Sequence, residues 1–149
     1  MTTNIRTEID DDGILTMTWD MPGRSMNVFT EEVMEELTAI VEAVTADAAV
    51  KGTVITSGKD TYSGGADLTM LKRMLGQFAK DSKKDSAKAV QTLFDNVGFM
   101  NKLFRRIETS GKPWVSAING TCMGGTFEMS LACHGRVAAD GDKVNMALP

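Results

Sequence analysis

The chain has 149 residues, a formal net charge of −4, 42% hydrophobic residues and 24% charged residues, which is the balance of a folded globular domain and excludes a disordered chain. Its 16 basic residues are scattered and outnumbered by 20 acidic ones, so the basic footprint of a nucleic-acid-binding protein is absent. No apolar stretch reaches the roughly 18 residues of a membrane-spanning helix.

The first part of the chain predicts two strands, a helix and a third strand. Residues 4–9 and 13–19 alternate in hydrophobicity about a polar turn, as paired strands do. From residue 30 to about residue 47, apolar residues recur at helical spacing, with Thr30 as a candidate N-cap. The β-branched run 52–57 predicts a buried strand.

The second part predicts more helix, interrupted by strands. A turn is expected at 62–67, followed by a helix from Leu68 past Met74 and a charged surface break at 80–85. A long helix comes next, with an apolar face that runs from Val90 to Ile107. A strand at 114–118, a turn at 119–125, a helix at 125–133 and a strand at 136–139 complete the expected elements. This alternation indicates an α/β fold. We interpret the eleven methionines as core filler rather than a binding stripe.

The two cysteines indicate which cellular compartment the protein occupies. Cys122 and Cys133 form no CxxC pair and are accompanied by one histidine, His134, so neither a zinc site nor a disulfide framework is expected. The acidic amino-terminal sequence matches no secretory signal or transit peptide. We therefore expect buried, reduced thiols in a cytoplasmic protein. His134 is expected only to meet the carbonyl groups that end the preceding helix.

Two glycine-containing turns each follow a strand and open a helix. The first contains Gly64 and Gly65, and the second contains Gly124 and Gly125. Glycine lets backbone N–H groups approach a ligand, and a helix N-terminus carries partial positive charge. Two such turns that face one point would form an oxyanion hole, which polarises a carbonyl group and stabilises an enolate. Either turn alone is better explained as a plain structural turn.

Glu128 follows the second glycine pair in the first turn of its helix. Two interpretations stay open at this point. Glu128 is either a surface residue favoured by the helix dipole or a general base whose pKa is adjusted by a partly apolar pocket. Phe127, Met129 and Leu131 are the residues expected to supply that pocket.

In combination these motifs resemble the crotonase (enoyl-CoA hydratase/isomerase) family over nearly the whole chain. The matching segments are residues 20–27, similar to the family's early loop ending in Asn; residues 57–68, similar to its xxF-xAGAD segment; residues 112–120; and residues 124–133, similar to GGGxELALxC. The resemblance implies the N-terminal portion of a crotonase-type ββα spiral. Within the family, the chain is most similar to the hydratase part that opens multifunctional fatty-acid oxidation proteins, whose later portion is an NAD-dependent 3-hydroxyacyl-CoA dehydrogenase.

The resemblance implies a role for each matched residue. Ala66 and Gly125 match the two oxyanion-hole N–H donors, and Glu128 matches the first of two hydratase glutamates. The residues that match CoA- and substrate-binding surfaces are Arg24, Ser25, Met26, Gly64, Gly65, Asp67, Leu68 and Gly124, with Arg24 expected to meet a phosphate. No metal or cofactor is implied, because the CoA thioester is the substrate. NAD would enter only with a dehydrogenase portion.

Two features depart from the family pattern. Thr126 stands where the family has a third glycine, and we expect its Cβ to lie beside the oxyanion hole and narrow the acyl pocket. The family's second glutamate follows a Leu-Pro pair, and this chain ends on Leu148-Pro149. We therefore expect residues 1–149 to be a hydratase/isomerase domain incomplete at its C-terminus.

The resemblance implies an enoyl-CoA hydratase of fatty-acid β-oxidation, which adds water to trans-2-enoyl-CoA with syn stereochemistry. Two alternatives stay open: an acyl-CoA-binding fragment without turnover, and an enoyl-CoA isomerase, although Glu128 favours the hydratase. The complete protein is expected to be an oligomer, with a thiolase subunit as a candidate partner. The 149-residue chain alone is expected to be a poor catalyst.

Overall fold

A five-stranded sheet forms the base of the computed structural model, which describes residues 3–149. Its strands lie in the order β1-β2-β3-β4-β6: β1 (Ile5–Ile9), β2 (Ile14–Trp19), β3 (Gly52–Ser57), β4 (Trp114–Ile118) and β6 (Gly135–Ala138). The hairpin β1-β2 is antiparallel, and the other neighbours are parallel. The carboxyl ends of β2, β3 and β4 therefore meet at one edge of the sheet, which is where ligands bind in open α/β sheets.

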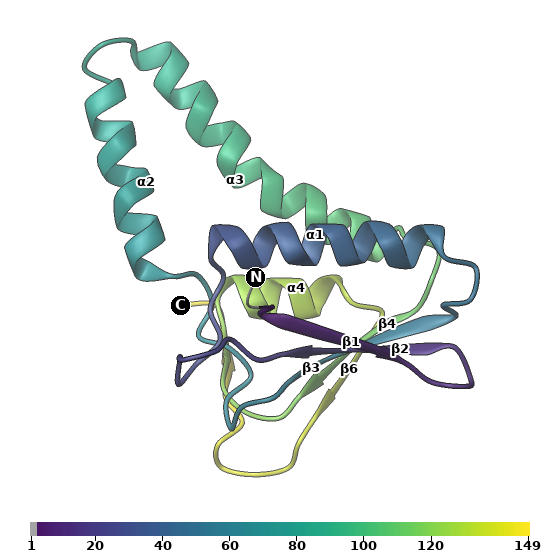
Figure 1. The fold of residues 1–149 in the computed structure, drawn as a ribbon. Coiled ribbons are helices and arrows are strands. Elements are labelled where there is room, and N and C mark those ends of the chain that lie inside the picture. The colour runs from purple at the N-terminus through teal and green to yellow at the C-terminus, as the bar shows by residue number, and fades with distance from the viewer. Residues whose placement is uncertain (1–2) are drawn as a thin grey trace.

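Within residues 3–149, four helices accompany the sheet: α1 (Glu31–Ala46), α2 (Leu68–Asp81), α3 (Ser86–Glu108) and α4 (Gly125–Ala132). The helices α1 and α4 lie over one face of the sheet, whereas α2 and the first part of α3 extend away from it (Figure 1). The burial agrees with this arrangement: α2 has no buried residue, and α3 buries Leu103, Phe104 and Ile107 near its C-terminal end. The α2–α3 hairpin is thus anchored mainly through the end of α3.

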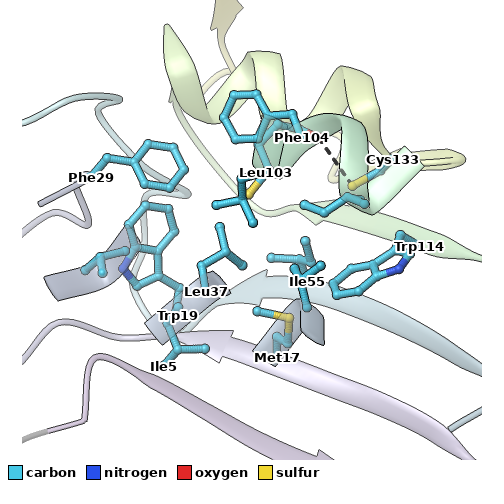
Figure 2. Packing of buried hydrophobic residues seen from close by; sticks show 14 of the residues in the cluster. Ile5, Met17, Trp19, Phe29, Leu37, Ile55, Leu103, Phe104, Trp114 and Cys133 are labelled. Atoms are coloured by element: carbon cyan, nitrogen blue, oxygen red, sulfur yellow. Dashed lines mark hydrogen bonds between the residues drawn. The ribbon is translucent and has the colours of Figure 1, made fainter. Parts of the chain in front are cut away.

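The hydrophobic core lies between the sheet and the helices α1, α3 and α4. Figure 2 shows Met17 and Ile55 of the sheet facing Leu37, Leu103 and other helix residues. Aromatic rings connect the sheet to α3 through Phe29: the ring centroids of Trp19 and Phe29 are 5.0 Å apart, and those of Phe29 and Phe104 are 6.2 Å apart. Phe29 precedes α1 directly, so this packing fixes the start of α1 against the end of β2.

The predicted strands and helices are confirmed, with two additions. The segment predicted as a turn at 119–125 contains β5 (Cys122–Met123), which pairs in parallel with β7 (Met146–Ala147). Strands of two residues carry no periodic signal, so the sequence could not indicate them. The charged break is shorter than expected, because α2 continues to Asp81 and Asp85 is already the N-cap of α3.

Cys122 and Cys133 are buried free thiols, as the sequence predicts. Burial raises the pKa of Cys133 to about 12 and also raises that of Cys122. The expectation for His134 is wrong: its Nδ1 accepts a hydrogen bond from the Trp114 N–H (3.2 Å). Arg136 instead binds the terminal carbonyl groups of α4, because its long side chain folds back over the helix end.

Asn27 joins the ends of two strands to the first glycine-containing turn. Its side chain is fully buried, and its Oδ1 accepts a hydrogen bond from the Met21 N–H (3.0 Å). Its Nδ2 donates to the Trp19 carbonyl (2.8 Å) and to Ser57 Oγ (2.9 Å), with the Tyr62 carbonyl 3.2 Å away. One amide group thus satisfies polar atoms at the ends of β2 and β3 and in the segment that follows β3.

We expect Asn27→Ala to lower the free energy of unfolding by at least about 2 kcal/mol, because each buried group left without a partner costs roughly 1–3 kcal/mol. Urea unfolding followed by circular dichroism measures this change. Asn101→Ala, at an exposed position of α3, is the control and should stay within about 0.5 kcal/mol of the parent protein. Equal stability of the two variants would contradict the role given to Asn27.

Candidate active site

The turn that contains Ala66 pairs with the segment before α1. Phe29 and Ala66 form a parallel β-bridge, in which the Phe29 N–H donates to the Gly65 carbonyl (2.8 Å) and the Asp67 N–H donates to the Phe29 carbonyl (2.9 Å). In this register the Ala66 N–H points away from Phe29. Within residues 3–149 it finds no acceptor, so it is available to a ligand.

The other edge of the same turn lies against β5. The Ser63 N–H donates to the Thr121 carbonyl (2.9 Å), and the Met123 N–H donates to the Ser63 carbonyl (3.1 Å). Gly65 has a φ of +87°, and a Cβ at this position would lie 2.7 Å from the Met123 carbonyl oxygen. Only glycine fits both the dihedral angle and the space, and its presence lets the two glycine-containing turns approach each other closely.

The second turn leaves the start of α4 open. Gly124 is the N-cap residue, with φ 53° and ψ −131°, and its N–H donates to the Ala147 carbonyl (2.9 Å). No side chain caps the helix, and the N–H groups of Gly125, Thr126 and Phe127 have no acceptor in the described part of the chain. An uncapped helix N-terminus presents hydrogen-bond donors and partial positive charge to a ligand.

A cleft of about 700 Å³ lies between α2 and α3, above the starts of α1 and α4. Ala66 and Glu128 both line it, and the exposed Glu128 carboxylate belongs to the first turn of α4. Gly125 borders it, because a Cβ there would lie 3.2 Å from the Cε of the lining residue Met100. The predicted donors and the predicted base are therefore brought together at one cleft.

The apolar lining of the cleft differs from the prediction. Phe127, Met129 and Leu131 are not among its residues: Met129 is in the core, and Leu131 is exposed on the surface. Phe127 and Met129 are the direct neighbours of Glu128 on the helix and therefore point to other faces. Leu131, three residues further on, shares the outward face of Glu128 but is not a lining residue of the cleft. The lining comes instead from other helices, through Met34, Met70, Met74, Val97, Phe99 and Met100.

The interpretation of the methionines as core filler is therefore only partly right. Met17, Met21 and Met129 are buried in the core. Four others line the cleft, on α1, α2 and α3. Met129 lies on a helix, as the four cleft methionines do, so residue type and helical position alone could not separate a core-facing methionine from a cleft-facing one.

Arg24 and Asp67 form an ion pair beside the Ala66 turn. Arg24 Nη1 lies 2.7 Å from Asp67 Oδ2, and Asp67 Oδ1 accepts from the N–H groups of Thr69 (2.8 Å) and Met70 (3.0 Å) at the start of α2. The Met70 N–H and the Arg24 guanidinium together hold the pKa of Asp67 below its ordinary value. Asp67 thus ties the 24–26 loop to α2, and Arg24 keeps 47% of its side chain exposed.

The other residues predicted to hold CoA surround this ion pair. Ser25 and Leu68 are exposed, and Met26 covers Gly64, where a Cβ would lie 2.5 Å from the Met26 sulfur. Gly64 and Gly65 shape the turn, and Gly124 shapes the start of α4. None of these residues lines the cleft itself, and their contact with CoA stays a prediction.

The expectation that Thr126 narrows the acyl pocket is wrong. Its side chain is fully buried and does not line the cleft. The Thr126 Oγ1 lies 2.8 Å from Ser63 Oγ, on the side of α4 that faces the first turn. A helix N-terminus turns each successive side chain by about 100°, which directs Thr126 into the protein and Glu128 outward.

The structure also shows polar residues of the site that sequence reasoning missed. Ser63 and Asn27 are buried beside the donor turn, and Glu31 and Arg73 form an ion pair of 2.6 Å at the cleft. Asn27 and Ser63 lie within segments that match the family, 20–27 and 57–68, but the sequence analysis gave neither residue a role in the site. The pairing of Glu31 with Arg73 spans two helices and has no local signature.

A sequence profile described as enoyl-CoA hydratase/isomerase matches residues 10–148. Together with the open α/β sheet, the two free N–H donors and the cleft-facing glutamate, this match shows that the chain belongs to the enoyl-CoA hydratase/isomerase family.

Curated relatives are named fatty acid oxidation complex subunit alpha. The protein from Shewanella amazonensis is 37% identical over 140 residues, which cover 93% of this chain and 18% of the relative. The protein from Idiomarina loihiensis is 37% identical over 143 residues, which cover 95% of this chain and 18% of the relative. The chain therefore spans about a fifth of the length of these relatives.

Solved structures confirm the crotonase-type fold. An enoyl-CoA hydratase from Bacillus anthracis superposes with a TM-score of 0.73 at 22% identity, covering 97% of this chain and 50% of that one. An enoyl-CoA hydratase from Bacillus halodurans superposes with a TM-score of 0.70 at 26% identity, covering 91% of this chain and 50% of that one. No helix within residues 3–149 is both long and apolar enough to cross a membrane.

The lowered pKa of Asp67 predicts how the Arg24 ion pair responds to pH. A depressed folded-state pKa stabilises the protein above the ordinary value near 3.8, and this stabilisation is lost as the pH falls through the lowered value. Asp67→Asn keeps an oxygen that can cap α2 but removes the charge. We expect the variant to be less stable than the parent at pH 7 in urea unfolding.

The stability difference should shrink as the pH falls below about 4, because the Asp67 carboxylate of the unfolded chain takes up a proton there before that of the folded protein does. Asp11→Asn, in the exposed β1–β2 turn, is the matched control for loss of one negative charge. A difference between Asp67→Asn and the parent that is the same at pH 7 and pH 3 would contradict the ion-pair assignment.

Proposed function

We propose that the chain forms the oxyanion hole and one catalytic carboxylate of an enoyl-CoA hydratase of fatty-acid β-oxidation, which adds water to a trans-2-enoyl-CoA thioester. One observation carries the proposal: Ala66, with its free N–H group, and Glu128 line one largely apolar cleft, and Gly125, whose N–H group is also free, lies next to the lining residue Met100. Membership of the enoyl-CoA hydratase/isomerase family supports it.

The thioester carbonyl oxygen would accept hydrogen bonds from the Ala66 and Gly125 N–H groups. Negative charge develops on this oxygen when water attacks the conjugated double bond. The two donors belong to turns that are fixed by main-chain hydrogen bonds, so they require little reorganisation when the charge develops. Donors of this kind stabilise the enolate more than they stabilise the bound substrate.

Glu128 would orient the attacking water and remove one of its protons. The water oxygen forms a bond to C3, the π electrons of the C2–C3 double bond move toward the thioester carbonyl, and an enolate results. The enolate then takes up one proton at C2, on the face from which the water came, and Glu128 gives up the proton it removed, so that H and OH of one water are added overall with syn stereochemistry. The exposed position of Glu128 at the cleft supports this role because water reaches it freely.

The acyl chain would enter the cleft between α2 and α3. A volume of about 700 Å³ is typical of small-molecule sites, which range from roughly 300 to 1,000 Å³. Methionines on three helices line it, and their flexible thioether chains adapt to chains of different shape. The CoA part would lie over the loop and turn that carry Arg24, Ser25, Met26 and Leu68, with the exposed guanidinium of Arg24 toward a phosphate.

The names of the relatives extend this proposal to the complete protein. We propose that it works with a partner subunit of the thiolase class, because the relatives are named as a subunit of a fatty acid oxidation complex. Hydration moves no electrons, so the proposed reaction calls for no redox cofactor; NAD would serve only a dehydrogenase portion. Free buried thiols fit a reducing compartment, and a cytoplasmic location is part of the proposal.

We expect Glu128→Gln, in the protein as its gene encodes it, to lower kcat for the hydration of crotonyl-CoA by about 10²–10⁴, the usual contribution of an acid–base group. Glutamine keeps the size and polarity of the side chain but cannot take the proton. Loss of the absorbance of the conjugated thioester measures the rate, and calorimetry measures acyl-CoA binding, which should change little.

Glu31→Gln is the matched control, because Glu31 is another exposed carboxylate at the same cleft and takes no part in the proposed reaction. It should leave kcat within about threefold, since changes away from the reacting atoms are usually small. Acyl-CoA binding without turnover by the parent protein would favour the binding alternative. Movement of the double bond without addition of water would favour the isomerase.

A further inference from the structure

We infer that the buried hydroxyl pair of Ser63 and Thr126 sets the spacing between the two oxyanion-hole donors, which makes Thr126 a positioning residue for hydration. This inference rests on the proposed function. Ser63 Oγ and Thr126 Oγ1 lie 2.8 Å apart, and both residues are 0% exposed. One belongs to the turn that carries Ala66 and the other to the helix that begins at Gly125.

Counting the hydrogens assigns the direction of this contact. The Ser63 hydroxyl donates its single hydrogen to the Asn27 carbonyl (2.9 Å) and accepts a hydrogen bond from the Gly65 N–H (3.2 Å). A hydroxyl group has one donor and two acceptor sites. The Thr126 hydroxyl must therefore be the donor to Ser63, and the pair then fills all three sites of the Ser63 oxygen.

Each end of the pair is linked to a proposed oxyanion donor through a single neighbouring residue or bond. Ser63 Oγ holds the N–H of Gly65, whose peptide bond continues directly into the Ala66 N–H. Thr126 follows Gly125 directly in α4. A rotation of either turn would lengthen the hydroxyl contact, in a region without solvent where such bonds are strong. The pair therefore resists a change in the separation of the two donors.

A second buried chain of hydroxyl groups joins the same two elements. Tyr62 Oη lies 2.7 Å from Ser116 Oγ, which lies 2.9 Å from Ser130 Oγ. Ser130 in turn donates to the Thr126 carbonyl (2.9 Å), one helical turn back. This chain holds α4 near the Tyr62 segment even when the Thr126 hydroxyl is removed. We therefore expect loss of that hydroxyl to shift the donors without unfolding the site.

Threonine adds a hydroxyl group that the glycine of the family pattern lacks. Its β-branched side chain has few χ1 rotamers, so its hydroxyl stays directed at Ser63. Valine has nearly the same shape but would leave an acceptor site of Ser63 unfilled. Serine would keep the hydroxyl and lose only a methyl group. These two replacements separate the hydrogen bond from the packing of the side chain.

The test compares Thr126→Val with Thr126→Ser in the protein as encoded, by crotonyl-CoA kinetics and by the amide NMR resonances of the ligand-free protein. We expect Thr126→Val to lower kcat by about 10- to 100-fold, as a misplacement of about 1 Å does, with KM changed less than about threefold. Thr126→Ser should retain most of the parent kcat. A merely structural role would lower the melting temperature of both variants without this split between kcat and KM.

The NMR readout does not depend on turnover, so it separates this inference from the proposed function. Thr126→Val should shift the amide resonances of Gly65 and Ala66, far away in the sequence, whereas Thr126→Ser should leave them near their parent positions. A parent protein without hydratase activity would overturn the proposed function, and the amide shifts would still decide whether the pair couples the turns. Gly65 and Ala66 resonances that are unchanged in Thr126→Val would overturn the inference. If the valine variant does not fold, Thr126→Ala is compared with Thr126→Ser in its place.

Discussion

The close approach of the 63–67 turn to β5 is the constraint on which the site depends. Gly65 makes it possible, because any side chain there would meet the Met123 carbonyl. Main-chain hydrogen bonds to residues 27–29 on one side and 121–123 on the other then fix the turn at the carboxyl edge of the sheet. This pairing leaves the Ala66 N–H without a main-chain acceptor in the described residues. The uncapped N-terminus of α4 lies at the same edge of the sheet.

The floor of the cleft is rigidly packed, whereas its walls contribute little to the hydrophobic core. Its donors belong to segments that are packed around fully buried residues such as Asn27, Phe29 and Thr126. The walls of the cleft come from α2, which buries no residue, and from the part of α3 that extends away from the sheet (Figure 1). Substitutions in these walls would therefore affect the fit of an acyl chain more than the stability of the sheet.

Much of the fold followed from local patterns, because hydrophobic periodicity and capping residues act within a few positions of each other. The strands and helices are confirmed. Ala66 and Glu128 line one cleft, and their catalytic roles stay predictions. The surroundings of Glu128 were predicted wrongly, since residues adjacent on a helix point to different faces and the actual lining comes from three other segments. The direction of Thr126 could not be known either, because it depends on Ser63, sixty-three positions earlier.

The central claim is that the N–H groups of Ala66 and Gly125 receive the thioester oxygen. Amide NMR of the ¹⁵N-labelled protein during titration with a saturated acyl-CoA, which cannot be hydrated, tests it most directly. The account predicts that the Ala66 and Gly125 amide protons move downfield together and saturate at the same ligand concentration, because both donate to one carbonyl oxygen. Saturable binding that leaves both resonances unmoved would contradict it.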